Sequence, residues 1–135
     1  MGVITCRALV PGSAVGEALV TDVPFSFWGG YDHATGRITD VHHPLCGESA
    51  AGKVLCVPFT KGSSTTANVL LQAIKSGTAP VAIVTQEPDA FLALASIVAD
   101  EMWGAPIPVV ALDRVSFGRL QTGHRLRIEG GSVEI

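Results

Sequence analysis

Three short apolar runs in the middle of the chain, at residues 53–58, 81–84 and 107–112, do most to limit what it can fold into. A run that is apolar at nearly every position is typical of a strand buried on both faces. Between these runs the apolar residues recur at helical spacing. The alternation of buried strands with helices predicts an α/β fold with a sheet and covering helices.

The first of these helices has clear signals at both ends. Ser63 or Ser64 serves as its N-cap, and Lys75 with Gly77 closes its last turn. Its apolar residues, at positions 67, 70, 71 and 74, fall on one face. We therefore predict an amphipathic helix packed on the sheet.

The second helix is expected to start with Pro88 as its first helical residue and to run to about Met102, before Gly104. It is apolar nearly all round, so either it is enclosed in the core or one face contacts another chain. The composition favours a partner, because 47% of residues are hydrophobic and only 16% are charged. Large exposed apolar patches mark interaction sites.

Both ends of the chain read as strands. Residues 3–10 and 17–20 are separated by the turn Pro11-Gly12-Ser13, and residues 123–135 alternate apolar and polar around a Gly-Gly turn. Hairpins at both ends would flank the central unit. Residues 25–49 form a long irregular stretch of the kind that compact domains keep for function. We predict a mixed three-layer unit that forms one domain over residues 1–135.

Several classes of function are disfavoured. The longest apolar stretch, residues 90–99, is too short to span a bilayer. The net charge is −3, and the Lys and Arg residues are scattered and do not cluster into the positively charged patch that nucleic-acid binding requires. The first residues lack an export signal, and Cys6, Cys46 and Cys56 are odd in number and widely spaced. We expect a cytoplasmic protein with reduced thiols, no membrane contact and no bound DNA or RNA.

Two short motifs resemble functional sites without supporting them. Residues 47–53 fit the spacing of a phosphate-binding loop, but Val54 replaces the magnesium-binding hydroxyl residue and the lysine precedes a strand instead of a helix. His42, His43 and Cys46 could supply three metal ligands, yet no fourth is near. We interpret them as a polar loop with one packed thiol, in which a histidine could still line a pocket.

The most informative segment is the hydroxyl-rich loop at residues 60–66, between a buried strand and a helix. Such a loop lies at the carboxyl end of the strand, where open sheets bind ligands. The hydroxyls could simply cap the helix, for which one is enough. Alternatively, the helix N-terminus could stabilise a bound anion or a deprotonated serine. Both interpretations stay open at this point.

A second unusual segment is Phe27-Trp28-Gly29-Gly30-Tyr31-Asp32. A tryptophan beside two glycines predicts a backbone held close to another group, with a flat apolar wall next to it. The simpler interpretation is that Trp28 fills the core and the glycines turn the chain. The chain shows no Gly-x-Ser-x-Gly motif, so ordinary serine hydrolysis has little support.

Taken in order, several motifs resemble one family, the swivel-domain subunit of the aconitase X proteins in the aconitase superfamily of dehydratases. The resemblance implies a single swivelling β/β/α domain like the C-terminal domain of aconitase. It covers nearly the whole chain and rests on residues 27–32, His43-Pro44-Leu45, residues 51–55, Lys61-Gly62-Ser63-Ser64 and Gly77-Thr78-Ala79-Pro80.

The resemblance also implies a division of labour between two subunits. A large catalytic subunit, separate or fused, would carry an iron or iron–sulfur centre that acts as a Lewis acid on the leaving hydroxyl. This chain would hold no metal. Its Ser63 would remove the substrate proton, as an alkoxide stabilised by Lys61 and the helix N-terminus. The substrate-binding residues would be Lys61, Gly62, Ser64, Thr65, Trp28, Gly29 and Gly30.

Three departures from the aconitase pattern point to a different, smaller substrate. Thr65 and Trp28 stand where aconitase has arginines, and Lys61 stands where many aconitase X relatives have one. Lysine keeps the charge without the fork that grips an anion with two bonds. The resemblance implies two possible substrates, cis-3-hydroxy-L-proline and mevalonate 5-phosphate. The scarcity of arginine favours the first, whose dehydration would give a pyrroline-2-carboxylate.

Two rival functions of other classes follow from the same sequence. One is a non-catalytic swivel module that only binds a partner. The other, a phosphocarrier domain, needs an exposed histidine on a loop, whereas His124 falls in a predicted strand. The sequence therefore favours a dehydratase subunit over both.

Overall fold

The computed structural model describes residues 2–61 and 64–135, and for Ser64 the backbone alone. The strands, helices and their bounds, in chain order, are β1 (Val3–Thr5), β2 (Arg7–Val10), β3 (Ser13–Val20), β4 (Tyr31–Asp32), β5 (Arg37–Ile38), β6 (Val54–Cys56), α1 (Ser64–Ser76), β7 (Ala82–Thr85), α2 (Ala90–Trp103), β8 (Val109–Ala111), α3 (Arg114–Phe117), β9 (Arg125–Glu129) and β10 (Ser132–Glu134). None of the helices in the described residues is long and apolar enough to cross a membrane.

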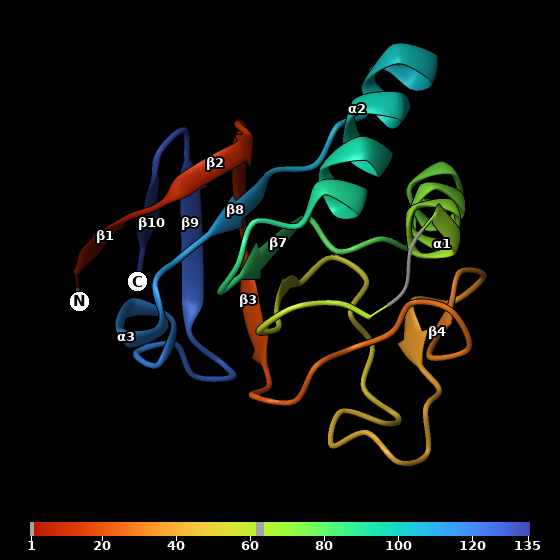
Figure 1. The fold of residues 1–135 in the computed structure, drawn as a ribbon, viewed down its shortest axis with the longest axis horizontal. Helices are drawn as coiled ribbons and strands as arrows, with labels where there is room; N and C mark the ends of the chain where they lie inside the picture. The colour runs from red at the N-terminus through yellow and green to blue at the C-terminus, as the bar shows by residue number, and fades with distance from the viewer. Residues whose placement is uncertain (1, 62–63) are drawn as a thin grey trace.

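The main sheet curls into a closed barrel. Its strand order is β1-β10-β9-β3-β6-β7-β8-β2, so β1 and β2 stand at opposite ends of the order although only Cys6 separates them in the chain. The N-terminal segment therefore joins both edges of the sheet (Figure 1). At the junction, the Cys6 amide donates to the Gly131 carbonyl at 2.9 Å.

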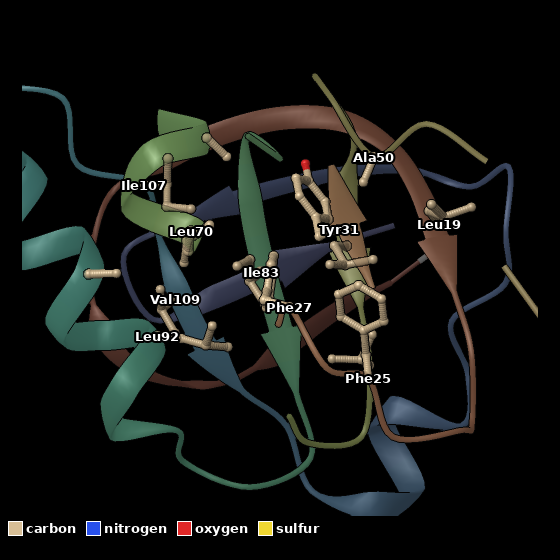
Figure 2. Packing of buried hydrophobic residues seen from close by; sticks show 14 of the residues in the cluster. Leu19, Phe25, Phe27, Tyr31, Ala50, Leu70, Ile83, Leu92, Ile107 and Val109 are labelled. Carbon is tan, nitrogen blue, oxygen red and sulfur yellow. The ribbon is translucent and has the colours of Figure 1, made fainter. Parts of the chain in front are cut away.

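Strands β3, β6, β7 and β8 are parallel, and β6, β7 and β8 are buried on both sides, as their apolar sequences predict. On β6, Val54 and Cys56 belong to the core inside the barrel, and Leu55 belongs to the core outside it. Phe117 of α3 belongs to the inner core. The outer core packs beneath α1, α2 and the irregular segment, and Figure 2 shows Leu70, Leu92 and Phe25 among its side chains. The predicted α/β class, with helices over a sheet, is confirmed.

Helix α1 begins at Ser64 and is followed by Gly77 in a left-handed conformation, as predicted. The predicted start of α2 is wrong by two residues. Asp89 is the N-cap, with its carboxylate accepting from the Phe91 and Leu92 amides, so Pro88 precedes the cap. Gly104, with φ of 62°, ends α2 where the sequence predicts.

Only one face of α2 is buried, so the alternative in which the core encloses this apolar helix is wrong. Residues on the inner face, such as Leu92 and Ala95, are buried against the sheet and α1. The opposite face exposes large apolar side chains to solvent: Phe91, Leu94, Ile97 and Met102. We call these four residues the apolar face of α2.

A hairpin is expected at each end of the chain, and of these two the described residues form only the C-terminal one. The C-terminal hairpin of β9 and β10 is confirmed, with its turn at Gly130-Gly131. The predicted N-terminal hairpin is wrong, because β2 pairs with β8 whereas β3 pairs with β9 and β6. Ser13, expected in a turn, opens β3. In the closed barrel β2 and β3 pair with different strands, and the local sequence around the turn does not specify those partners.

Candidate functional site

The backbone after β6 is held against the irregular segment. Phe25 forms a parallel bridge with Thr60. On either side of it, the Phe25 amide donates to the Phe59 carbonyl at 3.2 Å and the Lys61 amide donates to the Phe25 carbonyl at 2.9 Å. The segment that leads into the hydroxyl-rich loop therefore has a fixed path as far as Lys61.

The loop is also anchored where α1 begins. Thr66 is buried, and its hydroxyl donates to the Lys61 carbonyl at 3.0 Å. Lys61 and Thr65 are exposed on either side of the loop. Gly62 and Ser63 lie outside the described residues, as does the side chain of Ser64, so the catalytic role of Ser63 stays a prediction. The described residues on the two sides of the loop, Lys61 and Thr66, are therefore joined by a direct hydrogen bond.

A contact that sequence reasoning missed ties this loop to α2. The Thr60 hydroxyl donates to Oδ2 of Asp89. The other carboxylate oxygen of Asp89 accepts from the amides of Phe91 and Leu92, both at 3.1 Å. The N-cap position of Asp89 could have been recognised from sequence, but its second contact, 29 residues back along the chain, could not.

Trp28 does not fill the core, contrary to the simpler sequence interpretation. It is 68% exposed, whereas Phe25 and Phe27 are fully buried with their rings edge-on at 5.0 Å. The turn behind Trp28 requires both glycines. Gly29 has φ of 75°, and a Cβ on Gly30 would lie 2.3 Å from the Ser26 carbonyl oxygen. The fold thus presents an indole on the surface three residues from the Phe25 bridge.

The three side chains considered above as possible metal ligands, His42, His43 and Cys46, lie in different environments. The buried His43 ring packs edge-on against Phe25 at 5.4 Å, and its Nδ1 accepts from the Leu45 amide at 3.1 Å. Its Nε2 lies 3.4 Å from the Val23 carbonyl oxygen. His42 and Cys46 are exposed, so the expected packing of the Cys46 thiol is wrong.

No cluster of metal ligands emerges from the described part of the chain. Over residues 2–61 and 64–135, no three His, Cys, Asp or Glu side chains gather so as to hold a metal ion. Residues 47–53, with the spacing of a phosphate-binding loop, lead into β6 and not into a helix. The described residues of this chain therefore do not fit an iron or iron–sulfur centre of their own.

Comparison with known proteins decides the family. The model of the aconitase X swivel domain matches residues 3–135. The chain belongs to the aconitase X swivel domain family. The family and the β/β/α fold inferred from the sequence motifs are thereby confirmed. The swivel domain's fold is also that of a solved structure, Thermococcus kodakaraensis aconitase X in its holo-form, with a TM-score of 0.88 and 36% identity over 100% of this chain and 98% of that one.

Curated relatives of this aconitase X swivel domain include proteins with two different names. Cis-3-hydroxy-L-proline dehydratase of Pseudomonas aeruginosa is 42% identical over 98% of this chain, which spans only 23% of that protein. Phosphomevalonate dehydratase small subunit of Pyrococcus furiosus is 38% identical over 96% of this chain and 92% of its own length. The same domain thus occurs as a small subunit and as about a fifth of a longer chain.

Proposed function

We propose that this swivel domain is the small subunit of a cytoplasmic hydro-lyase that dehydrates a small β-hydroxy carboxylate and is active only with a larger catalytic subunit. One observation carries the proposal: relatives with both names, at 38% and 42% identity, are dehydratases. The non-catalytic module and the phosphocarrier have no such support among these relatives.

Within this proposal, the loop at residues 61–65 supplies the base and part of the binding site. Ser63 Oγ accepts the proton from the carbon next to the substrate carboxylate. A serine hydroxyl is a poor base in water, so its alkoxide must be stabilised by the N-terminus of α1 and by the Lys61 ammonium, in a site closed to solvent. Gly62, Ser64 and Thr65 complete the loop that contacts the substrate.

Trp28, Gly29 and Gly30 form the second part of the proposed binding site. The Phe25 bridge fixes the start of this turn beside Thr60 and Lys61. An exposed indole can cover a small ring by apolar contact while residues 61–65 hold the carboxylate. This arrangement favours a compact cyclic substrate.

We propose cis-3-hydroxy-L-proline as that substrate and mevalonate 5-phosphate as the alternative. Among the residues assigned to the site, Lys61 is the one cation. One ammonium suffices for a single carboxylate, whereas a substrate with both a carboxylate and a phosphate needs further cations, preferably arginines that bind with two bonds.

The partner would cover the exposed apolar surface. The apolar face of α2 leaves Leu94 and Ile97 about half exposed, at 48% and 50%. An apolar stripe of this kind is typical of a surface that another protein covers. We assign it to the large subunit, which would also carry the iron or iron–sulfur centre, because the described residues of this chain do not form a site for one.

The test is reconstitution with the large subunit and an assay on both substrates. The pair should dehydrate cis-3-hydroxy-L-proline, and Ser63→Ala should lower kcat by about a thousandfold or more while the two subunits still copurify. Ser76→Ala, at the other end of α1, is the matched control and should retain full turnover. Near-normal turnover of Ser63→Ala would exclude Ser63 as the base, and turnover of mevalonate 5-phosphate alone would transfer the proposal to the alternative substrate.

A further inference from the structure

The two peptide units that flank the Cα atom of Lys61 are both held by hydrogen bonds from other parts of the chain. On one side, the Lys61 amide donates to the Phe25 carbonyl at 2.9 Å. On the other side, the Lys61 carbonyl accepts from the Thr66 hydroxyl at 3.0 Å. A residue has only two soft backbone torsions, φ and ψ. With both peptide units held, the direction in which the Lys61 side chain leaves the backbone is set.

The two groups that hold Lys61 are themselves fixed in the core. Phe25 is fully buried, and its ring packs edge-on against Phe27. Thr66 is only 1% exposed and lies in the first turn of α1, which packs against α2. A buried hydroxyl needs an acceptor, and the Lys61 carbonyl supplies it. The contact therefore joins a rigid helix to the backbone of an exposed residue.

Lys61 itself is exposed, and the proposed function assigns its ammonium to the substrate carboxylate. A lysine side chain has a flexible four-carbon stem, and it loses rotamer entropy when the ammonium binds an anion. Freedom at the Lys61 backbone would add to this loss. The hydrogen bond from Thr66 removes that freedom before the substrate arrives, so it should strengthen binding without touching the substrate.

We propose that Thr66 is a positioning residue, which acts through the Lys61 carbonyl to set the direction from which the Lys61 ammonium reaches the substrate carboxylate. This inference rests on the proposed function. Thr66 is shielded from solvent, so its part in substrate recognition is indirect. The capping of α1 does not account for its hydroxyl, because the helix begins two residues earlier, at Ser64.

Four substitutions separate positioning from a purely structural role. Thr66→Val keeps the shape of the side chain and removes the hydroxyl, and Thr66→Ser restores it. Lys61→Met removes the ammonium and keeps an unbranched side chain. Thr85→Val is the matched control, because Thr85 is also fully buried and its hydroxyl also donates to a backbone carbonyl, that of Glu87, at 2.6 Å.

In the reconstituted dehydratase, Thr66→Val should lower kcat/KM about tenfold, and Thr66→Ser should recover it to within about threefold. Thr85→Val should change kcat/KM by less than about twofold. When Lys61 is already methionine, Thr66→Val should cost less than about twofold more, because no ammonium remains to be directed. An equal loss in the two backgrounds would overturn the proposal, since Thr66 would then act independently of Lys61.

Amide hydrogen exchange, measured by NMR in the 135-residue chain, tests the anchor without relying on turnover. The Lys61 amide should exchange about tenfold faster in Thr66→Val and at its original rate in Thr85→Val. Unaltered exchange in Thr66→Val would contradict the anchoring. If the original pair dehydrates neither substrate, the proposed function fails and this inference fails with it. An active original pair with an unaffected Thr66→Val variant would overturn the inference alone.

Discussion

The Tyr31 hydroxyl donates a hydrogen bond to the Thr78 carbonyl oxygen at 2.8 Å, and this bond ties the irregular segment to the residues that follow α1. Tyr31 is buried, so its removal should leave the Thr78 carbonyl short of a donor. We expect Tyr31→Phe, which keeps the ring, to lower the free energy of unfolding by about 1 kcal/mol in urea denaturation. An unchanged midpoint would show that water replaces the lost donor.

Alkaline pH should destabilise the chain. Burial raises the pKa of the Tyr31 hydroxyl and of the Cys56 thiol above their ordinary values. In the unfolded chain these groups lose their protons near about pH 10 and 8.5, while the folded chain retains them. The unfolded state then binds fewer protons, so the free energy of unfolding falls as pH rises.

Urea denaturation between about pH 7 and 11 measures this slope. The decline should begin near about pH 8.5 and steepen above about pH 10. Tyr31→Phe should flatten the upper part of the profile, because it removes the hydroxyl whose pKa burial raises. A Tyr31→Phe profile parallel to the original at every pH would argue against titration of the Tyr31 hydroxyl as the cause.

The turn behind Trp28 offers a matched pair of glycines. An added Cβ at Gly30 would meet the Ser26 carbonyl oxygen at 2.3 Å, whereas at Gly29 it would meet nothing within 4 Å, although φ there is positive. Gly29→Ala should therefore cost only the strain of a left-handed residue, about 1 kcal/mol. Gly30→Ala must instead move the backbone away from the Ser26 carbonyl oxygen, so it should destabilise the fold more and lower turnover further. If the two substitutions changed kcat equally, the conformation of this turn would not contribute to the active site.

The apolar face of α2 should decide subunit pairing. Changing Leu94 and Ile97 together to glutamate should weaken binding of the large subunit by at least about tenfold, because two apolar contacts are replaced by charges that must be desolvated. The control is Val115→Glu on α3, a valine that is 80% exposed. Isothermal titration of the purified subunits gives the affinities. Full affinity in the Leu94 and Ile97 double variant would place the interface elsewhere.

The central strands and helices could be predicted because their signals are local. Continuous apolar runs mark β6, β7 and β8, and an apolar stripe marks α1. Closure of the barrel could not be predicted, because β1 pairs with β10 at the far end of the chain and nothing in either short strand specifies the other. The exposure of Trp28 was equally hidden, since composition favours burial of an indole and only the turn geometry overrides it.

In the candidate site too, local motifs could be predicted from the sequence, whereas contacts between distant residues could not. The motifs from residue 27 to residue 32 and from Lys61 to Ser64 pointed to the family and so to the candidate residues. The contact between Thr60 and Asp89 joins two loops through side chains, and hydroxyl and carboxylate residues are common in loops for many reasons. Their pairing follows from the parallel order of β6 and β7, which brings the ends of both strands to one edge of the sheet.

The barrel closes through the pairing of Val3 with Glu134, at opposite ends of the chain. During synthesis β1 is made long before β10, so β1 stays unpaired until the hairpin of β9 and β10 has been made. Pairing of such distant segments is slow, because the loop that it closes includes nearly every residue. A newly made chain therefore exposes two open sheet edges until its final strand arrives, and this is the stage at which it is most prone to aggregate.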